Sequence, residues 1–354
     1  MDEKVAKLCV APECSILDAI KVLDETHERI LLVVDKQRLL GVFTDSDVRK
    51  WILKTRDLTE KITAAMTKKP VCVRVDEKEQ AAGLMERYGI DAIPVVDGEG
   101  FVQELLFRYE TPEWENPKRE TTQAPVVIMA GGKGTRLAPY TQVLPKPLIP
   151  IGNTTILEQV IASFQNAGCS RFYISVNYKK NLIKAYVQDL HPAYEVTYVE
   201  EEHFLGTAGS LSLLKNKIQE PFFVSNCDIL LDVDYAKVMK FHKKNGNAIT
   251  MITSLKNYTI PYGIVNIGDK GQVETLSEKP EMSFLVNTGV YVLEPEVLSL
   301  IPQDSFLHIT ELIELCIRQG KKVGAYPVTE KAWEDMGEIS SMEAMLRARG
   351  AEEE

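Results

Sequence analysis

The chain has little of four things: long apolar runs, cysteine, histidine and net positive charge. Its 354 residues include 41 Lys and Arg against 51 Asp and Glu, which gives a formal net charge of −10 at pH 7. This balance argues against a broad surface for nucleic acid or an anionic membrane, because both require a basic face. No apolar run approaches the roughly 20 residues of a membrane span, and the opening residues MDEK do not resemble a signal peptide.

The six cysteines and five histidines are scattered along the chain. Only Cys9 and Cys14 are close in sequence, and no pair of histidines accompanies them, so the spacing does not indicate a zinc site. Dispersed thiols in a chain without a leader are typical of reduced proteins, and we therefore expect a cytoplasmic location. The scattered histidines also give no support for a Ser-His-Asp centre.

The most informative stretch that is present reads VVIMAGGKGTRLAPYTQVLPKP, residues 126–147. An apolar run, long enough for one buried strand, leads directly into three glycines, and the cations Arg136 and Lys146 follow. Glycine lets main-chain N–H groups come close to an anion, so the pattern predicts a cradle for a polyphosphate. The spacing fits neither a P-loop nor the three-glycine dinucleotide fingerprint.

The run GGKGTRL and the later Pro-Lys-Pro resemble the sugar-1-phosphate nucleotidyltransferase family, whose members make NDP-sugars and pyrophosphate. The matched segments are residues 131–137 and 145–147, and the resemblance continues at intervals to about residue 340. It implies an α/β fold of the GT-A-like kind, with a Rossmann-like, mixed and mostly parallel sheet flanked by helices in residues 125–354. The alternation of strand and helix patterns after residue 125 agrees with that expectation.

The resemblance also implies roles for single residues. Arg136, Lys146 and Asp228 are expected to be catalytic, and Asp228 and Asp335 are expected to hold Mg²⁺. The residue before Asp228 is Cys227, where most relatives have glycine. The residues expected around the nucleotide are Ala130, Gly131, Gly132, Gly134, Thr135, Gly206, Thr207 and Ala208. Those expected around the sugar phosphate are Gly263, Glu278, Lys279, Asn287 and Gly289.

The expected substrates are inferred from the resemblance of one loop. The loop LGTAG, residues 205–209, looks most like those of guanylyltransferases acting on mannose-type or amino-hexose 1-phosphates. We therefore expect GTP as the donor and glucosamine 1-phosphate or mannose 1-phosphate as the acceptor. Two alternatives stay open: a uridylyl- or thymidylyltransferase acting on glucose 1-phosphate, and a nucleotide-sensing regulator with an inactive transferase domain.

The first third of the chain contains an internal repeat with an offset of 62 residues, which aligns Val33-Val34-Asp35 with Val95-Val96-Asp97. Two similar units packed together are expected from such a repeat. The pair resembles a tandem CBS module, with repeats at residues 1–60 and 61–115 and a linker at 116–124. A CBS module ahead of a transferase domain resembles a bacterial subgroup that makes GDP-linked amino sugars for glycan biosynthesis.

In CBS modules, adenosine nucleotides bind in clefts between the repeats. The segment GVFTDSD matches the family's ligand motif, which makes Thr44 a phosphate contact and Asp47 a ribose contact. The second repeat has Leu106 and Tyr109 at these positions, so only one adenosyl site is expected. The alternative is that Thr44 and Asp47 only cap a helix and the module is a dimerisation scaffold. Because paired CBS modules usually associate, we expect a homodimer or a higher homo-oligomer.

Overall fold

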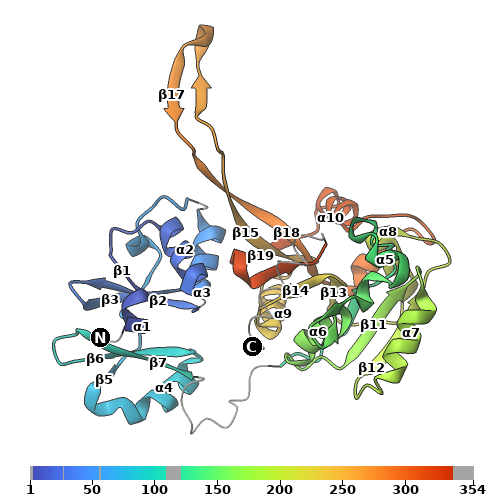
Figure 1. Cartoon of the computed structure of the whole chain (residues 1–354), viewed down its shortest axis with the longest axis horizontal. Helices are drawn as coiled ribbons and strands as arrows, with labels where there is room; N and C mark the ends of the chain where they lie inside the picture. The colour runs from blue at the N-terminus through green and yellow to red at the C-terminus, as the bar shows by residue number, and fades with distance from the viewer. Residues whose placement is uncertain (1–2, 27, 56, 109–120, 338–354) are drawn as a thin grey trace. The chain divides into compact units, whose positions relative to one another are not determined.

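The structure is a computed structural model that describes residues 3–26, 28–55, 57–108 and 121–337. The chain divides into two compact units, Met1–Arg119 and Glu120–Glu354. Their elements are drawn in Figure 1. The predicted linker lies partly outside the described residues, as does Tyr109. Within the described ranges, no helix combines the length and the apolar composition that crossing a bilayer requires.

The N-terminal unit contains two small sheets, in the orders β1-β2-β3-β4 and β5-β6-β7. The strands are Cys9–Val10, Ile30–Asp35, Arg38–Thr44, Thr67–Lys68, Val73–Arg74, Ala92–Val96 and Val102–Phe107. The helices are α1 (Glu3–Lys7), α2 (Ile16–Thr26), α3 (Asp45–Lys54) and α4 (Ala81–Tyr88). Helix α2 buries Ile16, Ala19, Ile20 and Leu23, a spacing that places one apolar stripe against the core.

The register of the two sheets reproduces the sequence repeat. Strands β2 and β3 pair antiparallel with an irregularity at Val33/Val34, and β6 and β7 do so with an irregularity at Val95/Val96. The two irregularities are offset by the same 62 residues that separate the sequence motifs. A bulge at equivalent points indicates that the two halves share one local fold, as the sequence predicts.

The C-terminal unit is built on a seven-stranded sheet in the order β12-β11-β8-β13-β18-β15-β19. The first four strands are parallel to one another, β18 is antiparallel to both neighbours, and β19 is parallel to β15. In sheet order the strands are Glu195–Glu200, Arg171–Val176, Val126–Met129, Phe222–Asn226, Glu281–Leu293, Ile249–Thr259 and Val323–Val328. The predicted mixed, mostly parallel sheet is therefore confirmed.

Both faces of this sheet are covered. Along β8, Val126 and Ile128 pack into one core and Val127 and Met129 into the other, as the alternation of a strand requires. Side chains from α6 (Ile156–Gln165), α7 (Lys180–Asp189) and α9 (Tyr235–Asn245) belong to the first core. Those from α10 (Ile309–Arg318) and the 3-10 turn Ser210–Leu214 belong to the second.

One predicted helix is shorter than expected. The sequence pattern after residue 210 predicts a helix to about residue 217, but the structure has only the turn α8 (Gly206–Gly209) and a 3-10 turn that ends at Leu214. The N–H groups of Ala208 and Gly209 donate to the Leu307 carbonyl, so a contact outside the segment fixes its first turn.

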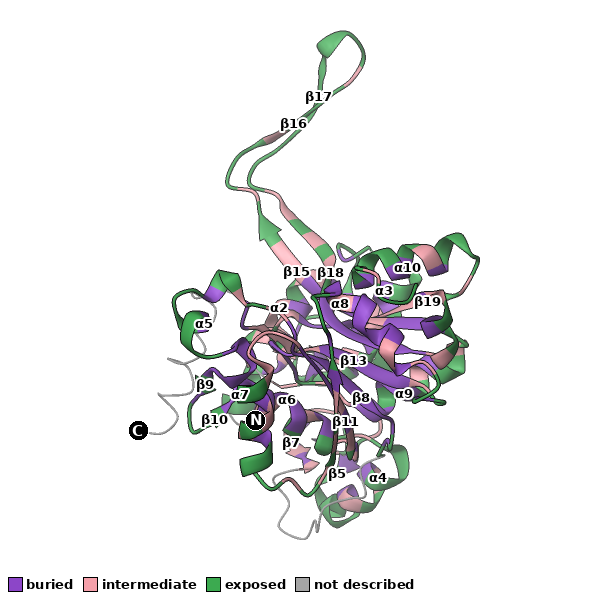
Figure 2. Ribbon diagram, turned by 90° about the vertical axis from the view of Figure 1, so that its right-hand side faces the viewer, coloured by how far each residue is buried: buried purple, intermediate pink, exposed green. Residues whose placement is uncertain are grey.

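Strands β15 and β18 continue beyond the sheet as a two-stranded ribbon that ends in the hairpin β16 (Ile264–Ile267) and β17 (Val273–Ser277). We call residues 258–284 the arm. Figures 1 and 2 both show it projecting from the C-terminal unit. The sequence predicts strands in this region, but their pattern does not show that they leave the body of the domain.

A buried histidine packs against the seven-stranded sheet of the C-terminal unit. His242 is fully buried in α9, with Nδ1 2.8 Å from Thr250 Oγ1 and Nε2 3.2 Å from Glu294 Oε1. Burial lowers the pKa of His242 to about 4. The unfolded chain takes up a proton near the ordinary pKa of about 6.5, whereas the folded chain stays neutral until about pH 4. The unfolded state therefore binds more protons between these values.

We expect the free energy of unfolding to fall by about 3 kcal/mol from this histidine as the pH decreases from neutrality to 4. Glu294 acts in the opposite direction, because burial and then the charge of Glu296 raise its pKa. Urea titrations across this pH range on the wild type and on His242→Asn isolate the histidine contribution. Equal pH slopes for the two proteins would contradict the prediction.

Candidate active site

The glycine-rich loop begins where β8 ends. The Ala130 N–H donates to the Ser175 carbonyl at 2.9 Å, which ties the loop to the neighbouring strand β11. Gly134 has φ +64°, a left-handed conformation that glycine adopts without steric cost. A Cβ at Gly131 would lie 2.7 Å from the Glu201 carboxylate oxygen Oε1. Glycine at this position therefore lets a buried carboxylate approach the loop.

Glu201 is a residue whose importance the sequence pattern did not reveal. It follows β12 and is buried. Its carboxylate accepts hydrogen bonds from the Ser175 hydroxyl and, at 3.0 Å, from the Leu205 N–H. One side chain thus connects the glycine-rich loop to the segment that opens into Gly206. The only signal in the sequence is an acidic residue directly after a strand, which is too common to single out.

A buried ion pair lies beside the loop. The Lys146 ammonium donates to the Asp228 carboxylate, and each residue is only 8% exposed. The stem of Lys146 packs against Gly134, since a Cβ there would lie 3.1 Å from Lys146 Cβ. The Thr141 hydroxyl donates to the Gly134 carbonyl at 2.9 Å and fixes this turn. Glycine conformation and lysine position are therefore coupled.

Asp335 lies beside Asp228, although it comes from a much later part of the sequence. The short strands β14 (Ile229–Leu231) and β20 (Trp333–Asp335) pair antiparallel, with Ile229 opposite Asp335. The Met336 N–H donates to the Asp228 carbonyl at 3.0 Å. The structure therefore brings the two predicted metal ligands together, although about a hundred residues separate them in sequence.

Arg136 completes the group. A Cβ at Gly337 would lie 2.8 Å from Asp335 Oδ1 and 3.3 Å from Arg136 Nη2, so both side chains flank this glycine. The Gly337 N–H donates to Asp335 Oδ1 at 2.7 Å. Burial raises the pKa of Asp335, the Asp228 charge raises it further, and Lys146 and Arg136 oppose the shift. Two carboxylates and two cations therefore share one partly buried space.

The donor set fits Mg²⁺ and does not fit zinc. Asp228 and Asp335 offer hard carboxylate oxygens, and Mg²⁺ is usually bound by one or two carboxylates together with substrate phosphates. In the part of the chain that the structure describes, no group of three or more His, Cys, Asp or Glu side chains could hold a metal ion. Cys227 is buried, and burial raises the pKa of its thiol to about 12, so it is not a thiolate ligand.

The 206–208 segment is held against the loop that precedes α10. Gly206 has φ +80°, and a Cβ there would lie 2.5 Å from the Leu307 carbonyl oxygen. The Ala208 N–H donates to that carbonyl at 2.9 Å, and the Thr207 hydroxyl accepts the Ile309 N–H at 3.0 Å. The Thr207 hydroxyl and the Ala208 N–H, both in residues predicted to contact the nucleotide, therefore already make hydrogen bonds within the protein.

Two predicted sugar-phosphate residues lie close to the aspartates. Gly289 has φ +88°, and a Cβ there would lie 2.6 Å from Nδ2 of Asn226 and 3.4 Å from Ile229 Cγ1. The Gly289 N–H donates to Asn287 Oδ1 at 3.1 Å. Asn226 ends β13 two residues before Asp228. It was not among the predicted site residues, and an asparagine at a strand end carries little signal by itself.

The other three predicted sugar-phosphate residues lie on the arm. Gly263 and Glu278 are neighbours there, since a Cβ at Gly263 would lie 2.9 Å from Glu278 Oε2. Both are exposed, as is Lys279. Strand β18 between Glu281 and Gly289 spans roughly 26 Å at about 3.3 Å per residue. The structure therefore does not bring these three residues to the aspartate pair of the same chain.

In the N-terminal unit, Thr44 and Asp47 form a helix cap. The Thr44 N–H and hydroxyl donate to Asp47 Oδ2 at 3.1 and 2.8 Å, and Thr67 Oγ1 donates to Oδ1 at 3.0 Å. This agrees with the alternative that Thr44 and Asp47 cap a helix. A ribose bound to Asp47 would have to replace the hydrogen bonds from Thr44 and Thr67. Adenine nucleotide binding stays a prediction, which calorimetry with AMP, ADP and ATP tests.

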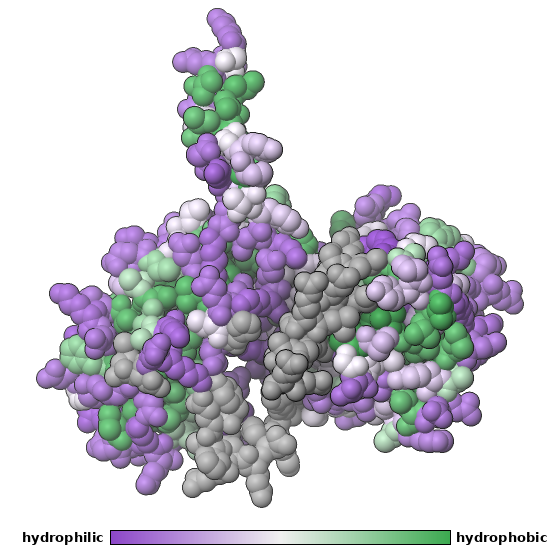
Figure 3. Space-filling model, viewed as in Figure 1, coloured by the Kyte–Doolittle hydropathy of each residue, from purple (hydrophilic) through white to green (hydrophobic). Residues whose placement is uncertain are grey.

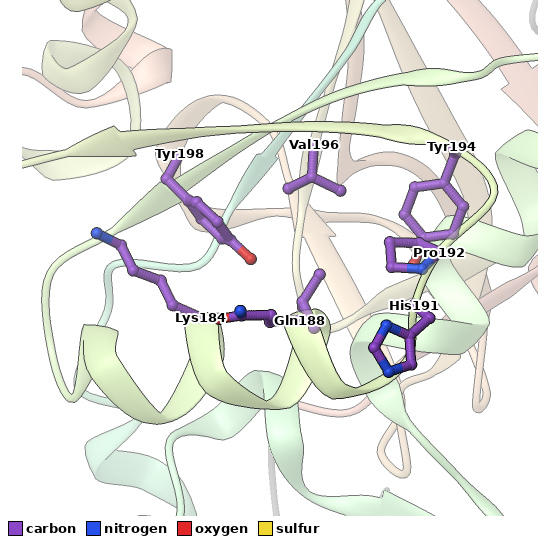
Figure 4. A pocket seen from close by; sticks show the side chains of 8 residues that line it. Lys184, Gln188, His191, Pro192, Tyr194, Val196 and Tyr198 are labelled. Carbon is purple, nitrogen blue, oxygen red and sulfur yellow. The ribbon is translucent and has the colours of Figure 1, made fainter.

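A surface groove of about 610 Å³ lies between α7 and β12 (Figure 4). Lys184, His191, Tyr194 and Tyr198 are among its lining residues, and no carboxylate lines it. None of the predicted site residues contributes to it. A groove without acidic side chains offers no carboxylate ligands for a hard cation, in contrast to the aspartate pair.

Comparison with known proteins identifies the family of each unit. Residues 125–350 match the nucleotidyl transferase family, and residues 1–54 and 60–103 match the CBS domain. The chain belongs to the nucleotidyl transferase family and carries CBS domains ahead of the transferase unit. Both resemblances noted in the sequence are therefore confirmed.

Two curated relatives are named as mannose-1-phosphate guanylyltransferases. A probable mannose-1-phosphate guanylyltransferase of Oryza sativa subsp. japonica is 32% identical over 184 residues, which cover 49% of this chain and 51% of the relative. A mannose-1-phosphate guanyltransferase of Pichia angusta is 31% identical over 223 residues, 60% of each chain. The chain thus spans about half to three-fifths of the length of these curated relatives.

Two solved structures share the fold. HddC from Yersinia pseudotuberculosis has a TM-score of 0.51 at 24% identity, over 64% of this chain and 99% of that one. A putative glucose-1-phosphate thymidylyltransferase from Bacillus anthracis has a TM-score of 0.50 at 20% identity, over 64% and 95%. These matches confirm the α/β fold of the C-terminal unit.

Proposed function

We propose that the chain transfers a nucleotidyl group from an NTP, GTP in preference, to a hexose 1-phosphate and releases pyrophosphate. The observation that carries the proposal is the meeting of Lys146, Asp228 and Asp335 beside a glycine-rich loop that also positions Arg136. Membership of the nucleotidyl transferase family supports the reaction class. The guanylyltransferase relatives support GTP over UTP and dTTP.

The proposed catalytic residues act by offsetting the negative charge of the substrates. Both substrates are polyanions, so their repulsion must be offset before the sugar phosphate can attack the α-phosphorus. Bound to Asp228 and Asp335, Mg²⁺ supplies charge neutralisation and orientation of the phosphates. Arg136 and Lys146 stabilise negative charge on the transferred and leaving phosphates, and backbone N–H groups of the glycine-rich loop hold the polyphosphate. No general base is required, because the attacking phosphate oxygen is already an anion.

Bond making and breaking balance without an intermediate on the protein. One oxygen of the hexose 1-phosphate forms a bond to the α-phosphorus as the bond to the β-phosphate oxygen breaks, and pyrophosphate leaves with that electron pair. We propose direct in-line displacement, since the site needs only positioning and electrostatic stabilisation. Mannose 1-phosphate and glucosamine 1-phosphate are the proposed acceptors, and a role in bacterial glycan biosynthesis is part of the same proposal.

A pyrophosphate-release assay tests the proposal. GTP, UTP, dTTP and ATP are each paired with mannose, glucosamine and glucose 1-phosphates in the presence of Mg²⁺. Release with GTP and either of the first two acceptors is expected. Release only with UTP or dTTP and glucose 1-phosphate would replace GTP by the alternative donor. No release with any pair would favour a nucleotide-sensing regulator with an inactive transferase domain.

A further inference from the structure

The arm presents an apolar face to solvent. On the hairpin, Val265 lies opposite Leu276 and Ile267 lies opposite Val273. These residues are 49%, 67%, 68% and 59% exposed, respectively. Lower on the arm, the rings of Tyr258 and Phe284 lie 6.1 Å apart, and both residues are exposed. Figure 3 shows the resulting block of hydrophobic surface on the projecting segment. A contiguous exposed apolar patch usually marks an interaction surface.

The arm is held in its extended position by continuous pairing. Strands β15 and β18 pair without a break from Thr253↔Asn287 to Thr259↔Glu281. The ladder continues with the Ile260 N–H donating to the Pro280 carbonyl at 3.0 Å. An isolated two-stranded hairpin is marginally stable in water, so an arm this long needs a partner surface.

Two residues that the family resemblance implies for the sugar-phosphate pocket, Glu278 and Lys279, lie on the arm. Lys279 and Glu278 lie roughly 26 Å or more along the extended strand from Gly289, which borders the aspartate pair. Asn287 and Gly289, by contrast, lie at the site. A sugar phosphate bound near Gly289 would therefore contact the aspartate side of its pocket but not the arm residues of the same chain.

We infer that two copies of this chain exchange arms, so that Glu278 and Lys279 of one copy complete the sugar-phosphate pocket of the other. In a two-fold dimer each copy gives an arm and receives one, which removes the exposed apolar face and completes both sites. The Lys279 ammonium would bind the acceptor phosphate and the Glu278 carboxylate the sugar hydroxyls. The identity of the pocket rests on the proposed function. The exchange itself rests on the exposed, extended arm.

Complementation between two inactive chains tests the exchange. Asp228→Asn removes a core ligand, and Lys279→Ala removes the arm cation. Each homodimer is expected to be nearly inactive. The heterodimer, co-expressed with two different tags and purified through both, is expected to recover about half of the wild-type activity, because one of its two sites then has both residues. Lys270→Ala, at the tip of the same arm, is the matched control and should leave activity unchanged.

If each arm serves its own chain, the heterodimer has no complete site, and activity no higher than that of the two homodimers would overturn the inference. Full activity of Lys279→Ala would also overturn it. Sedimentation velocity gives a readout that needs no substrate. The double variant Val265→Ser with Leu276→Ser should associate more weakly than the wild type, because it loses the arm contact even where the CBS modules also hold the chains together. Equal dissociation of the two proteins would overturn the exchange.

These readouts separate failure of the inference from failure of the proposed function. An active wild type with no complementation overturns the exchange and leaves the reaction intact. A wild type that releases no pyrophosphate with any substrate pair, but whose association depends on Val265 and Leu276, overturns the reaction and supports the arm contact.

Discussion

Replacing Asp228 by asparagine is expected to lower turnover by at least about 10³-fold, because a neutral amide is a poor ligand for a hard cation and no longer balances Lys146. The backbone should stay folded, since the Asp228 carbonyl that accepts the Met336 N–H is unchanged. Pyrophosphate release measures the first expectation and circular dichroism the second. Asp189→Asn, an exposed aspartate at the end of α7, is the matched control and should keep wild-type turnover.

Near-normal turnover in Asp228→Asn would contradict the proposed role of this carboxylate. Asp335→Asn provides an independent comparison, because its side chain approaches from a different strand. If both carboxylates act on one bound cation, the double variant should be little worse than either single variant. Multiplied losses would instead indicate two separate contributions.

Replacing Lys146 by alanine is expected to lower the free energy of unfolding by about 3 kcal/mol, because it leaves the buried Asp228 carboxylate without its ion-pair partner, beside the partly buried Asp335. Urea titration measures the loss. Lys180→Ala is the matched control, since its ion pair with Glu200 is on the surface and should contribute less than about 1 kcal/mol. Stability equal to that of the wild type would contradict the assigned contact.

The stability lost in the Lys146→Ala variant is expected to depend on pH. Loss of the cation should further raise the pKa of Asp335, which burial and then the Asp228 charge already raise. A raised folded-state pKa gives stability that is present at low pH and is lost as the pH rises through that pKa. The variant should therefore be closest to the wild type near pH 5 and furthest from it near pH 8. A deficit that grows on acidification would contradict this sign.

The sequence predicted the fold through local signals that act at short range. The apolar run before Gly131 became β8, and the stripe Ile156, Leu157, Val160, Ile161 and Phe164 became the buried face of α6. The Thr155–Glu158 capping box explains where α6 begins. Such patterns depend on neighbouring residues only, so they can be read without knowing the rest of the chain.

Features that depend on long-range packing were not predicted. Glu201 gained its place because Gly131, in a different loop, leaves room for it. The segment that begins at Gly206 is fixed by backbone contacts with Leu307, about a hundred residues away in sequence. Alternation along β15 and β18 predicts strands but not where their sheet ends, so the position of Glu278 and Lys279 outside the body of the domain carried no local signal.

The pairing of β14 with β20 has a consequence for biosynthesis. Asp228 emerges from the ribosome about a hundred residues before Asp335, and Lys146 emerges earlier still, so both precede the strand that carries Asp335. Because domains fold as units during synthesis, the pocket closes only when this strand docks. A chain interrupted before Trp333 would hold most of its sheet yet expose Ile229 and Leu231 to water, which would mark it as incomplete to chaperones and proteases.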